Sequence, residues 1–202
     1  MKMLIDLNKM RYCIFVWLQI VGLPFLVNNQ QSYPKVVIQT DLGAVTAEIY
    51  VEQAPVTAGN FLSLVEAGVY DTGASFYRVV RDDNQPNSDV KIEVIQGGLR
   101  DSRDKSLTPI RHETTQETGL KHVDGALSMA RSAPGTANSE FFICIGDQPE
   151  LDFGGRRNPD GVGFAVFGRI IDGMDVVLKI QQQEDRNQSL IDPVQIFSIR
   201  RR

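Results

Sequence analysis

The sequence predicts a mainly β protein, organised as a β-barrel capped by helices. Many short apolar or alternating segments recur along the chain, and residues that favour turns separate them. Two segments show the spacing of amphipathic helices, and no internal repeat is found. The 202 residues fit one domain with an appended segment.

The first elements are two strands and a helix. Residues 36–40 and 45–50 are apolar or alternate with polar residues, and the turn signal between them indicates a hairpin. Pro55 suits the first turn of a helix. Apolar residues recur at helical spacing from there to about residue 67, so the sequence predicts a helix over this range.

The remaining elements follow the same logic. A polar loop at residues 81–89 separates two strands, and the last strand alternates between apolar and polar residues. The further strands are predicted at residues 76–80, 91–95, 126–130, 141–145, 164–168 and 194–199, and a second helix at residues 172–182.

Residues 1–33 differ in kind from residues 34–202, which form the predicted folded domain. Three basic residues precede an apolar run at residues 13–27, as in a secretory signal. The run is shorter than the roughly 20 apolar residues that span a membrane comfortably. We expect an exported protein in the periplasm or another extracytoplasmic compartment. An uncleaved membrane anchor and a disordered extension are the alternatives.

Charge and the reactive residue types exclude several functions. The net charge is −4 and no basic stripe is present, which argues against nucleic acid as a partner. Cys144 is predicted to be a buried apolar residue without a disulfide partner in the folded domain. His112 and His122 match no metal-ligand spacing and are interpreted as surface loop residues. We expect no metal site.

The stretch from Gly125 to Cys144 is the most informative one. Two short apolar segments flank a loop of small residues that is rich in Gly, Pro, Ser and Asn. Exposed backbone beside buried aromatic rings suits the docking of an extended peptide, because backbone pairs with backbone while the rings hold one side chain.

Together with Phe76-Tyr77-Arg78, Gln96-Gly97-Gly98 and a strand from Phe164 to Gly168, this stretch resembles the cyclophilin family of peptidyl-prolyl isomerases. The resemblance covers roughly Lys35 to the C-terminus. It implies a closed barrel of eight antiparallel strands with a helix at each end. It also implies rotation about X-Pro bonds in exported or folding polypeptides, without a cofactor. We expect a monomer that acts on proline-containing polypeptides.

The chemistry needs a cation and an apolar slot. Rotation about a peptide bond before proline has a barrier of about 18–20 kcal/mol, because the C–N bond has partial double-bond character. A cation that donates a hydrogen bond to the nitrogen stabilises the twisted state more than either planar state. The resemblance assigns this donor to Arg78 and assigns Gln96 to the substrate backbone. A surface ion pair is the alternative role for Arg78.

The resemblance also assigns the residues that bind the substrate. Val94, Phe142 and Leu151 match the proline pocket, Ala130 presents backbone to the peptide, and Phe164 forms an apolar wall. The full set of expected substrate-binding residues is Phe76, Val94, Ala130, Arg131, Glu140, Phe142, Leu151 and Phe164.

Several positions depart from the family pattern. Glu93 replaces a pocket phenylalanine, Glu150 the tryptophan that many members use to bind cyclosporin, Arg131 an asparagine and Glu140 a glutamine. We therefore expect poor cyclosporin binding and weaker catalysis. A rival hypothesis is a proline-peptide binding module or chaperone with little turnover. Glu93, Glu140 and Glu150 either form an acidic rim that prefers basic peptides or are unrelated solvated residues.

Overall fold

The computed structural model describes residues 32–100 and 107–202. The predicted N-terminal signal or anchor, with Cys13, falls outside them apart from its last two residues. The strands are β1 (Lys35–Thr40), β2 (Gly43–Ile49), β3 (Ala74–Val80), β4 (Val94–Gly98), β5 (Ala126–Met129), β6 (Phe141–Cys144), β7 (Ala165–Asp172), β8 (Asp185–Arg186) and β9 (Ser189–Arg201). The α-helices are α1 (Pro55–Glu66), α2 (Thr115–Thr118) and α3 (Met174–Gln181).

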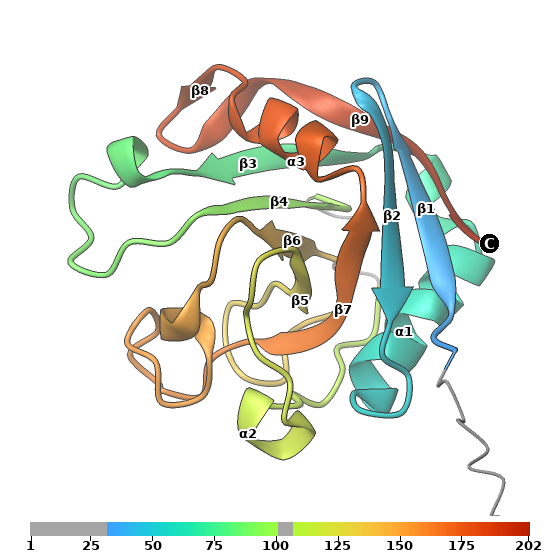
Figure 1. Ribbon diagram of the computed structural model, residues 1–202, viewed down its shortest axis with the longest axis horizontal. Coiled ribbons are helices and arrows are strands. Elements are labelled where there is room, and N and C mark those ends of the chain that lie inside the picture. The colour runs from blue at the N-terminus through green and yellow to red at the C-terminus, as the bar shows by residue number, and fades with distance from the viewer. Residues whose placement is uncertain (1–31, 101–106) are drawn as a thin grey trace, which may run out of the picture. The chain divides into compact units, whose positions relative to one another are not determined.

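Eight of these strands close into a barrel (Figure 1). The order β1-β2-β7-β5-β6-β4-β3-β9 returns to its start, because β9 also pairs with β1. Every pairing is antiparallel. The short β8 forms a hairpin with the start of β9 and stands outside the closed ring. The predicted eight-stranded antiparallel barrel is therefore confirmed.

The barrel interior is an apolar core that both long helices complete. Phe61 of α1 and Ile180 of α3 are fully buried in the same cluster. Phe61 packs against Phe141 and Phe167 with ring centroids 5.7 and 5.0 Å apart. Helices α1 and α3 lie on different sides of the strands (Figure 1). Within the described residues, no helix has the length and apolar character needed to cross a bilayer.

Strand β4 begins three residues later than predicted and includes Gln96 and both following glycines. The reason lies at Ile92, whose backbone bonds to the Gln85 side chain instead of a neighbouring strand. Gly97 and Gly98 are both buried. A Cβ at Gly97 would lie 2.7 Å from the Ser75 carbonyl oxygen, so the glycine permits close packing of β4 on β3.

Alternation along β6 separates two groups of buried side chains. Phe141 and Ile143 point into the barrel core. Phe142 and Cys144 belong to a second apolar cluster on the other face of the same strand. Successive side chains of a strand point to opposite faces of the sheet. The second cluster therefore lies outside the barrel ring, and Cys144 is buried there, as predicted.

Candidate active site

A cavity of about 440 Å³ opens over the outer face of β4 and β6. Nine of the ten residues that the sequence assigned to catalysis or substrate binding line it: Arg78, Val94, Gln96, Ala130, Arg131, Glu140, Phe142, Leu151 and Phe164. The structure thus gathers residues that are up to 86 positions apart in the chain (78 to 164) around one hollow. Their individual roles stay predictions.

Phe76 is the exception. Its side chain is fully buried in the barrel core and packs edge to face on Phe141, with ring centroids 5.8 Å apart. Phe76 lies on the inner face of β3, whereas Arg78 belongs to the cavity. Its assignment to substrate binding was wrong, because it supports the core beneath the site.

The register of three neighbouring strands places the central side chains in one row. Arg78 of β3 lies opposite Gln96 of β4, and Gln96 lies opposite Phe142 of β6. Residues directly opposite each other on adjacent strands share a face, and the strands are about 4.8 Å apart. Arg78 and Phe142 therefore flank Gln96 on the outer face of the barrel.

Two amide oxygens hold the guanidinium of Arg78. Its Nη1 donates to Gln96 Oε1 at 2.8 Å, and its Nε and Nη2 donate to Gln188 Oε1 at 3.2 and 2.6 Å. A guanidinium has five N–H donors, so these contacts leave two for a substrate. In the described part of the chain, no carboxylate forms an ion pair with Arg78.

Other groups fix both amides in the orientation that presents oxygen to Arg78. Gln96 Nε2 donates to Tyr77 Oη at 2.8 Å and to Glu140 Oε2 at 3.2 Å. Gln188 Nε2 donates to the Asn84 carbonyl oxygen at 3.2 Å. Since each amide nitrogen is engaged as a donor, each amide oxygen is left to accept from the cation.

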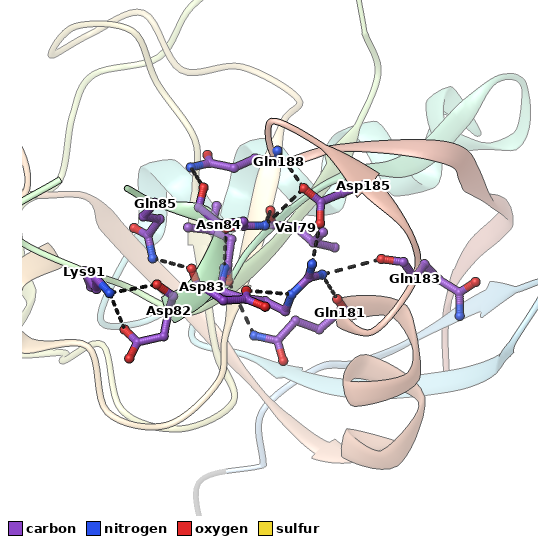
Figure 2. A network of polar contacts seen from close by, with 12 residues as sticks. Val79, Asp82, Asp83, Asn84, Gln85, Lys91, Gln181, Gln183, Asp185 and Gln188 are labelled. Carbon is purple, nitrogen blue, oxygen red and sulfur yellow. Dashed lines mark hydrogen bonds and ion pairs between the residues drawn. The ribbon is translucent and has the colours of Figure 1, made fainter. Parts of the chain in front are cut away.

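A polar network holds the hairpin that carries Gln188 (Figure 2). The Asp185 carboxylate accepts from the Gln188 backbone N–H at 2.8 Å and from Asn84 Nδ2 at 3.2 Å. Arg81 Nη2 forms an ion pair with the same carboxylate. Gln188 has a positive φ of 71° in the turn of this hairpin. Gln188 lies 110 residues from Arg78 along the chain, and no sequence motif indicates this contact.

The apolar part of the cavity is a slot around Phe142, Val94 and Leu151, each at most 4% exposed. Phe164 stands edge to face on Phe142, with ring centroids 5.2 Å apart. His122 stacks on the Phe142 ring at 5.9 Å, with 9° between the planes. The ring of Phe142 is thus held by two aromatic neighbours and lines the cavity.

His122 is 2% exposed, so its interpretation as a surface residue was wrong. Its Nδ1 lies 2.8 Å from Asp152 Oδ1 and its Nε2 lies 3.0 Å from Ser128 Oγ. Burial lowers the pKa of His122, so the ring is neutral and accepts from the Ser128 hydroxyl. This arrangement has the order of a hydrolytic triad, but Ser128 is fully buried and does not line the cavity. We assign it to holding Phe142.

The three glutamates that depart from the family pattern do not gather around the cavity. Glu93 does not line the cavity, and its neighbour Ile92 does. Glu150 forms an ion pair with Arg156, with 2.7 Å between Glu150 Oε1 and Arg156 Nη2, and does not line the cavity. Glu140 alone of the three glutamates lines the cavity, so the acidic rim is not formed.

Arg131, another departure from the pattern, forms hydrogen bonds and an ion pair with neighbouring residues. Its Nη1 lies 2.8 Å from Asp160 Oδ2, its Nε donates to the Gly163 carbonyl oxygen at 2.9 Å, and its Cζ lies 5.0 Å from the centre of the Phe164 ring. Arg131 therefore fixes the wall of the cavity that Phe164 forms.

Six further residues line the cavity without having been predicted. Strand alternation from Val94 and Gln96 would have found Ile92. The others lie in loops, where sequence spacing carries no information about facing. They are Ile92, Ser132, Thr136, Asn138, Arg157 and Asn158. Within the described residues, no group of three or more His, Cys, Asp or Glu side chains could hold a metal ion.

Comparison with known sequences gives one consistent result. The family model described as cyclophilin type peptidyl-prolyl cis-trans isomerase/CLD matches residues 35–201. A peptidyl-prolyl cis-trans isomerase of Acinetobacter baylyi is 38% identical over 147 residues, covering 71% of this chain and 69% of that protein. One of Arabidopsis thaliana is 33% identical over 171 residues, covering 82% and 92%.

Solved structures agree on the fold. A cyclophilin type peptidyl-prolyl cis-trans isomerase of Cryptosporidium parvum aligns with a TM-score of 0.66 at 24% identity, covering 85% of this chain and 98% of that one. A second structure of that protein, determined in the presence of the dipeptide Ala-Pro, aligns with a TM-score of 0.63 at 25% identity, covering 83% and 98%.

Proposed function

Because this chain belongs to the cyclophilin-type peptidyl-prolyl cis-trans isomerase family, it is an isomerase of X-Pro bonds, and we propose that Arg78 carries the catalysis. The proline ring occupies the slot around Phe142, and the two remaining N–H groups of Arg78 face the peptide bond. Nitrogen regains its lone pair as the bond twists, and the cation then binds it more strongly.

The observation that carries this proposal is the neutrality of the groups that hold Arg78. Two amide oxygens fix the guanidinium in a half-buried position without cancelling its charge. A carboxylate partner would compete with the developing lone pair for the same cation. Burial lowers the pKa of Arg78, yet an arginine keeps its proton in proteins. The site therefore offers a permanent, oriented cation that forms no ion pair with a carboxylate of the described residues.

The energy required is compatible with this arrangement. An acceleration of five decades corresponds to about 7 kcal/mol, at about 1.4 kcal/mol per decade. Removing one preorganised donor from an active site typically reduces the rate by about 10²–10³-fold. Packing of the proline ring in the slot supplies part of the remainder. A hydrogen bond from the peptide backbone to the second lone pair of Gln96 Oε1 supplies the rest.

The test is a peptide isomerisation assay, together with proline-limited refolding, on the wild-type protein and Arg78→Ala. We expect kcat/KM to fall by about 10²–10³-fold. Arg186→Ala is the matched control, since Arg186 is an exposed arginine of the β8–β9 hairpin. Unchanged activity in Arg78→Ala would contradict the assignment. Peptide binding without turnover in the wild type would favour the rival hypothesis of a binding module.

We propose that the substrates are proline-containing polypeptides that bind in extended form along the cavity. The dipeptide named for the Cryptosporidium parvum structure supports a proline ligand for this family member as well. The apolar slot is part of the cavity of about 440 Å³, which the exposed loop from Ser132 to Thr136 borders. Peptides with alanine in place of proline should bind at least about tenfold more weakly, as for loss of a buried apolar ring.

We propose that cyclosporin binds poorly. Glu150 stands where the family resemblance places tryptophan, and its carboxylate is committed to Arg156 at 2.7 Å. A charged pair replaces apolar surface there. Titration with cyclosporin, followed by isomerase activity, tests this: inhibition at nanomolar concentration would contradict it.

We propose that the protein is exported by a signal within residues 1–33. The support is the sequence alone, in which basic residues precede an apolar run at residues 13–27. Cell fractionation and mass spectrometry of the mature N-terminus test it. A membrane-bound protein with an intact N-terminus would show an anchor, and a cytoplasmic one would contradict export.

A further inference from the structure

Arg157 lines the cavity, and the loop from Gln85 to Val90 holds it at one end of the cavity. Its Nη1 lies 3.0 Å from Gln85 Oε1, 2.7 Å from Ser88 Oγ and 2.6 Å from the Val90 carbonyl oxygen. Gln85 in turn donates from Nε2 to the Ile92 carbonyl oxygen at 2.8 Å. Arg157 is therefore anchored at the level of Ile92, the first of three alternating residues along the cavity floor.

The partners of Arg157 are neutral, like those of Arg78. Across residues 32–100 and 107–202, no carboxylate forms an ion pair with Arg157, and its Nε and Nη2 contact no acceptor. Burial lowers the pKa of Arg157. The pKa of Arg78 is lowered by burial and, to a smaller extent, by the charge of Arg157. The two cations therefore repel each other across the cavity.

Glu140, the one carboxylate among the described residues that line the cavity, lies at the other end. Glu140 Oε2 accepts from Gln96 Nε2 at 3.2 Å, so it is fixed at the level of Gln96. Ile92 and Gln96 are four residues apart, which is about 13 Å of extended chain. The Gln96 end of the cavity thus holds the Glu140 anion together with the Arg78 cation. Arg157, at the Ile92 end, forms no ion pair with a carboxylate of the described residues.

The proline slot lies between these ends. Val94 and Phe142 form its floor, and Val94 is two residues from Ile92 along the strand. A peptide in extended form advances about 3.3 Å per residue. A side chain one or two residues from a bound proline therefore reaches the level of Arg157.

We propose that this cavity selects proline peptides that carry an acidic side chain within two residues of the proline, with Arg157 as its partner. The inference rests on the proposed function, since it takes the proline to lie in the slot. A preference for acidic peptides is the opposite of the preference for basic peptides that an acidic rim would have given. Arg131 does not share the role, because its side chain is 1% exposed and paired with Asp160.

The experiment measures peptides that differ at one position, with Glu, Gln or Lys placed one or two residues before or after the proline. Both kcat/KM and the dissociation constant are determined for the full chain. At one position we expect Glu to exceed Gln by about three- to tenfold, as for a partly buried ion pair. The ratio should shrink between about 20 mM and about 500 mM salt, because salt screens the pair.

Variants separate the charge from the fold. In Arg157→Gln, which keeps a donor for the loop, the Glu/Gln ratio should fall to about one, and in Arg157→Lys part of it should return. Arg156→Gln is the matched control, since Arg156 pairs with Glu150 outside the cavity. Equal values for Glu, Gln and Lys in the wild type, or a ratio that survives in Arg157→Gln, overturn the inference.

The two readouts keep this inference separate from the function itself. Turnover of all peptides without a charge preference removes the role of Arg157 and leaves the isomerase intact. Binding with the charge preference but without turnover supports Arg157 and counts against the catalytic role of Arg78.

Discussion

The inner and outer faces of strand β6 show how one strand serves two purposes. Phe141 points inward and contacts Phe61, Tyr70 and Phe76, all of them buried rings of the barrel core. Phe142, the next residue, points outward into the cavity and contacts His122 and Phe164. Two adjacent phenylalanines thus have different surroundings.

The difference lies in what backs each ring. Apolar side chains surround Phe141, so its burial stabilises the fold without specifying any chemistry. Behind Phe142 lies a buried polar group of His122, Asp152 and Ser128, and beside it stands Arg78 between two amides. Buried polar groups stabilise little unless their hydrogen bonds are satisfied, and here they hold a ring in place. Stability and activity should therefore separate between the two faces.

The largest effect on stability is expected from Phe141→Ala. Truncating a fully buried phenylalanine typically lowers the free energy of unfolding by about 3–5 kcal/mol. The loss of buried apolar surface and the cavity left behind both contribute to this cost. Urea unfolding followed by circular dichroism measures it. The fraction that stays folded should keep kcat/KM within about twofold of wild type, since no cavity-lining atom is removed. A loss below about 1 kcal/mol would contradict the separation of the two faces.

Phe142→Ala should reverse this pattern. The ring forms the floor of the proline slot, so we expect kcat/KM to fall by about 10–100-fold, as for loss of 1.4–2.7 kcal/mol of transition-state binding. Stability should fall by only about 1–2 kcal/mol, because the vacated space opens to water. The same assay and urea titration check both values. A stability loss as large as that of Phe141→Ala would remove the contrast.

Gln188 gives a smaller effect that is confined to the outer face. Gln188→Asn keeps a residue that tolerates the positive φ but is one methylene too short to hold Arg78 as Gln188 does. We expect kcat to fall about tenfold with KM nearly unchanged, as for a misplaced donor.

Asn187→Gly is the control for Gln188→Asn, because it keeps the turn and removes an exposed side chain. Equal loss in the two variants would show that the hairpin, rather than the amide of Gln188, matters. Gln188→Glu should also lower kcat, since a carboxylate at this position would neutralise the charge of Arg78.

The smallest effect is a pH dependence of stability from His122. Burial lowers its pKa in the folded state below the ordinary 6.5, so the unfolded state binds the proton first. The free energy of unfolding should be highest above pH 6.5 and fall as the pH drops toward the lowered pKa, by at most about 1.4 kcal/mol per unit.

Urea titrations between about pH 5 and 8 measure this slope, and His122→Gln should flatten it. His112, whose pKa burial also lowers, should give a smaller change when replaced by Gln, because it is more exposed than His122. A slope that is unchanged in His122→Gln would show that other groups titrate in this range.

Much of the architecture could be predicted from the sequence because it depends on local periodicity. Helical spacing placed both long helices within about two residues of their bounds, and alternation located each strand of the barrel at least in part. Strand β9 begins at Ser189, before the predicted residue 194, and β7 ends at Asp172, after the predicted residue 168. The start of β4 was misplaced, since Ile92 has strand-like composition but bonds to the Gln85 side chain. The barrel closure came from the family resemblance, because pairing of β1 with β9 joins segments about 160 residues apart and leaves no local signal.

Cavity-lining residues that belong to a motif were predicted, and most of those that were missed lie in distant loops. Arg78 and Gln96 belong to recognisable strand motifs. Gln188 and Arg157 lie in a hairpin and a loop whose positions depend on tertiary packing. Phe76 and His122 were misassigned because a sequence shows which residues are apolar or titratable, but not which face of the sheet receives them.

The most direct test of the account is the exchange rate between cis and trans forms of a peptide bound to Arg78→Gln. NMR exchange spectroscopy at saturating peptide measures it separately from affinity. The account predicts exchange at least about 100-fold slower than in wild type, with the dissociation constant changed by less than about threefold. Exchange at the wild-type rate, or a loss that lies wholly in affinity, would contradict the catalytic role of Arg78.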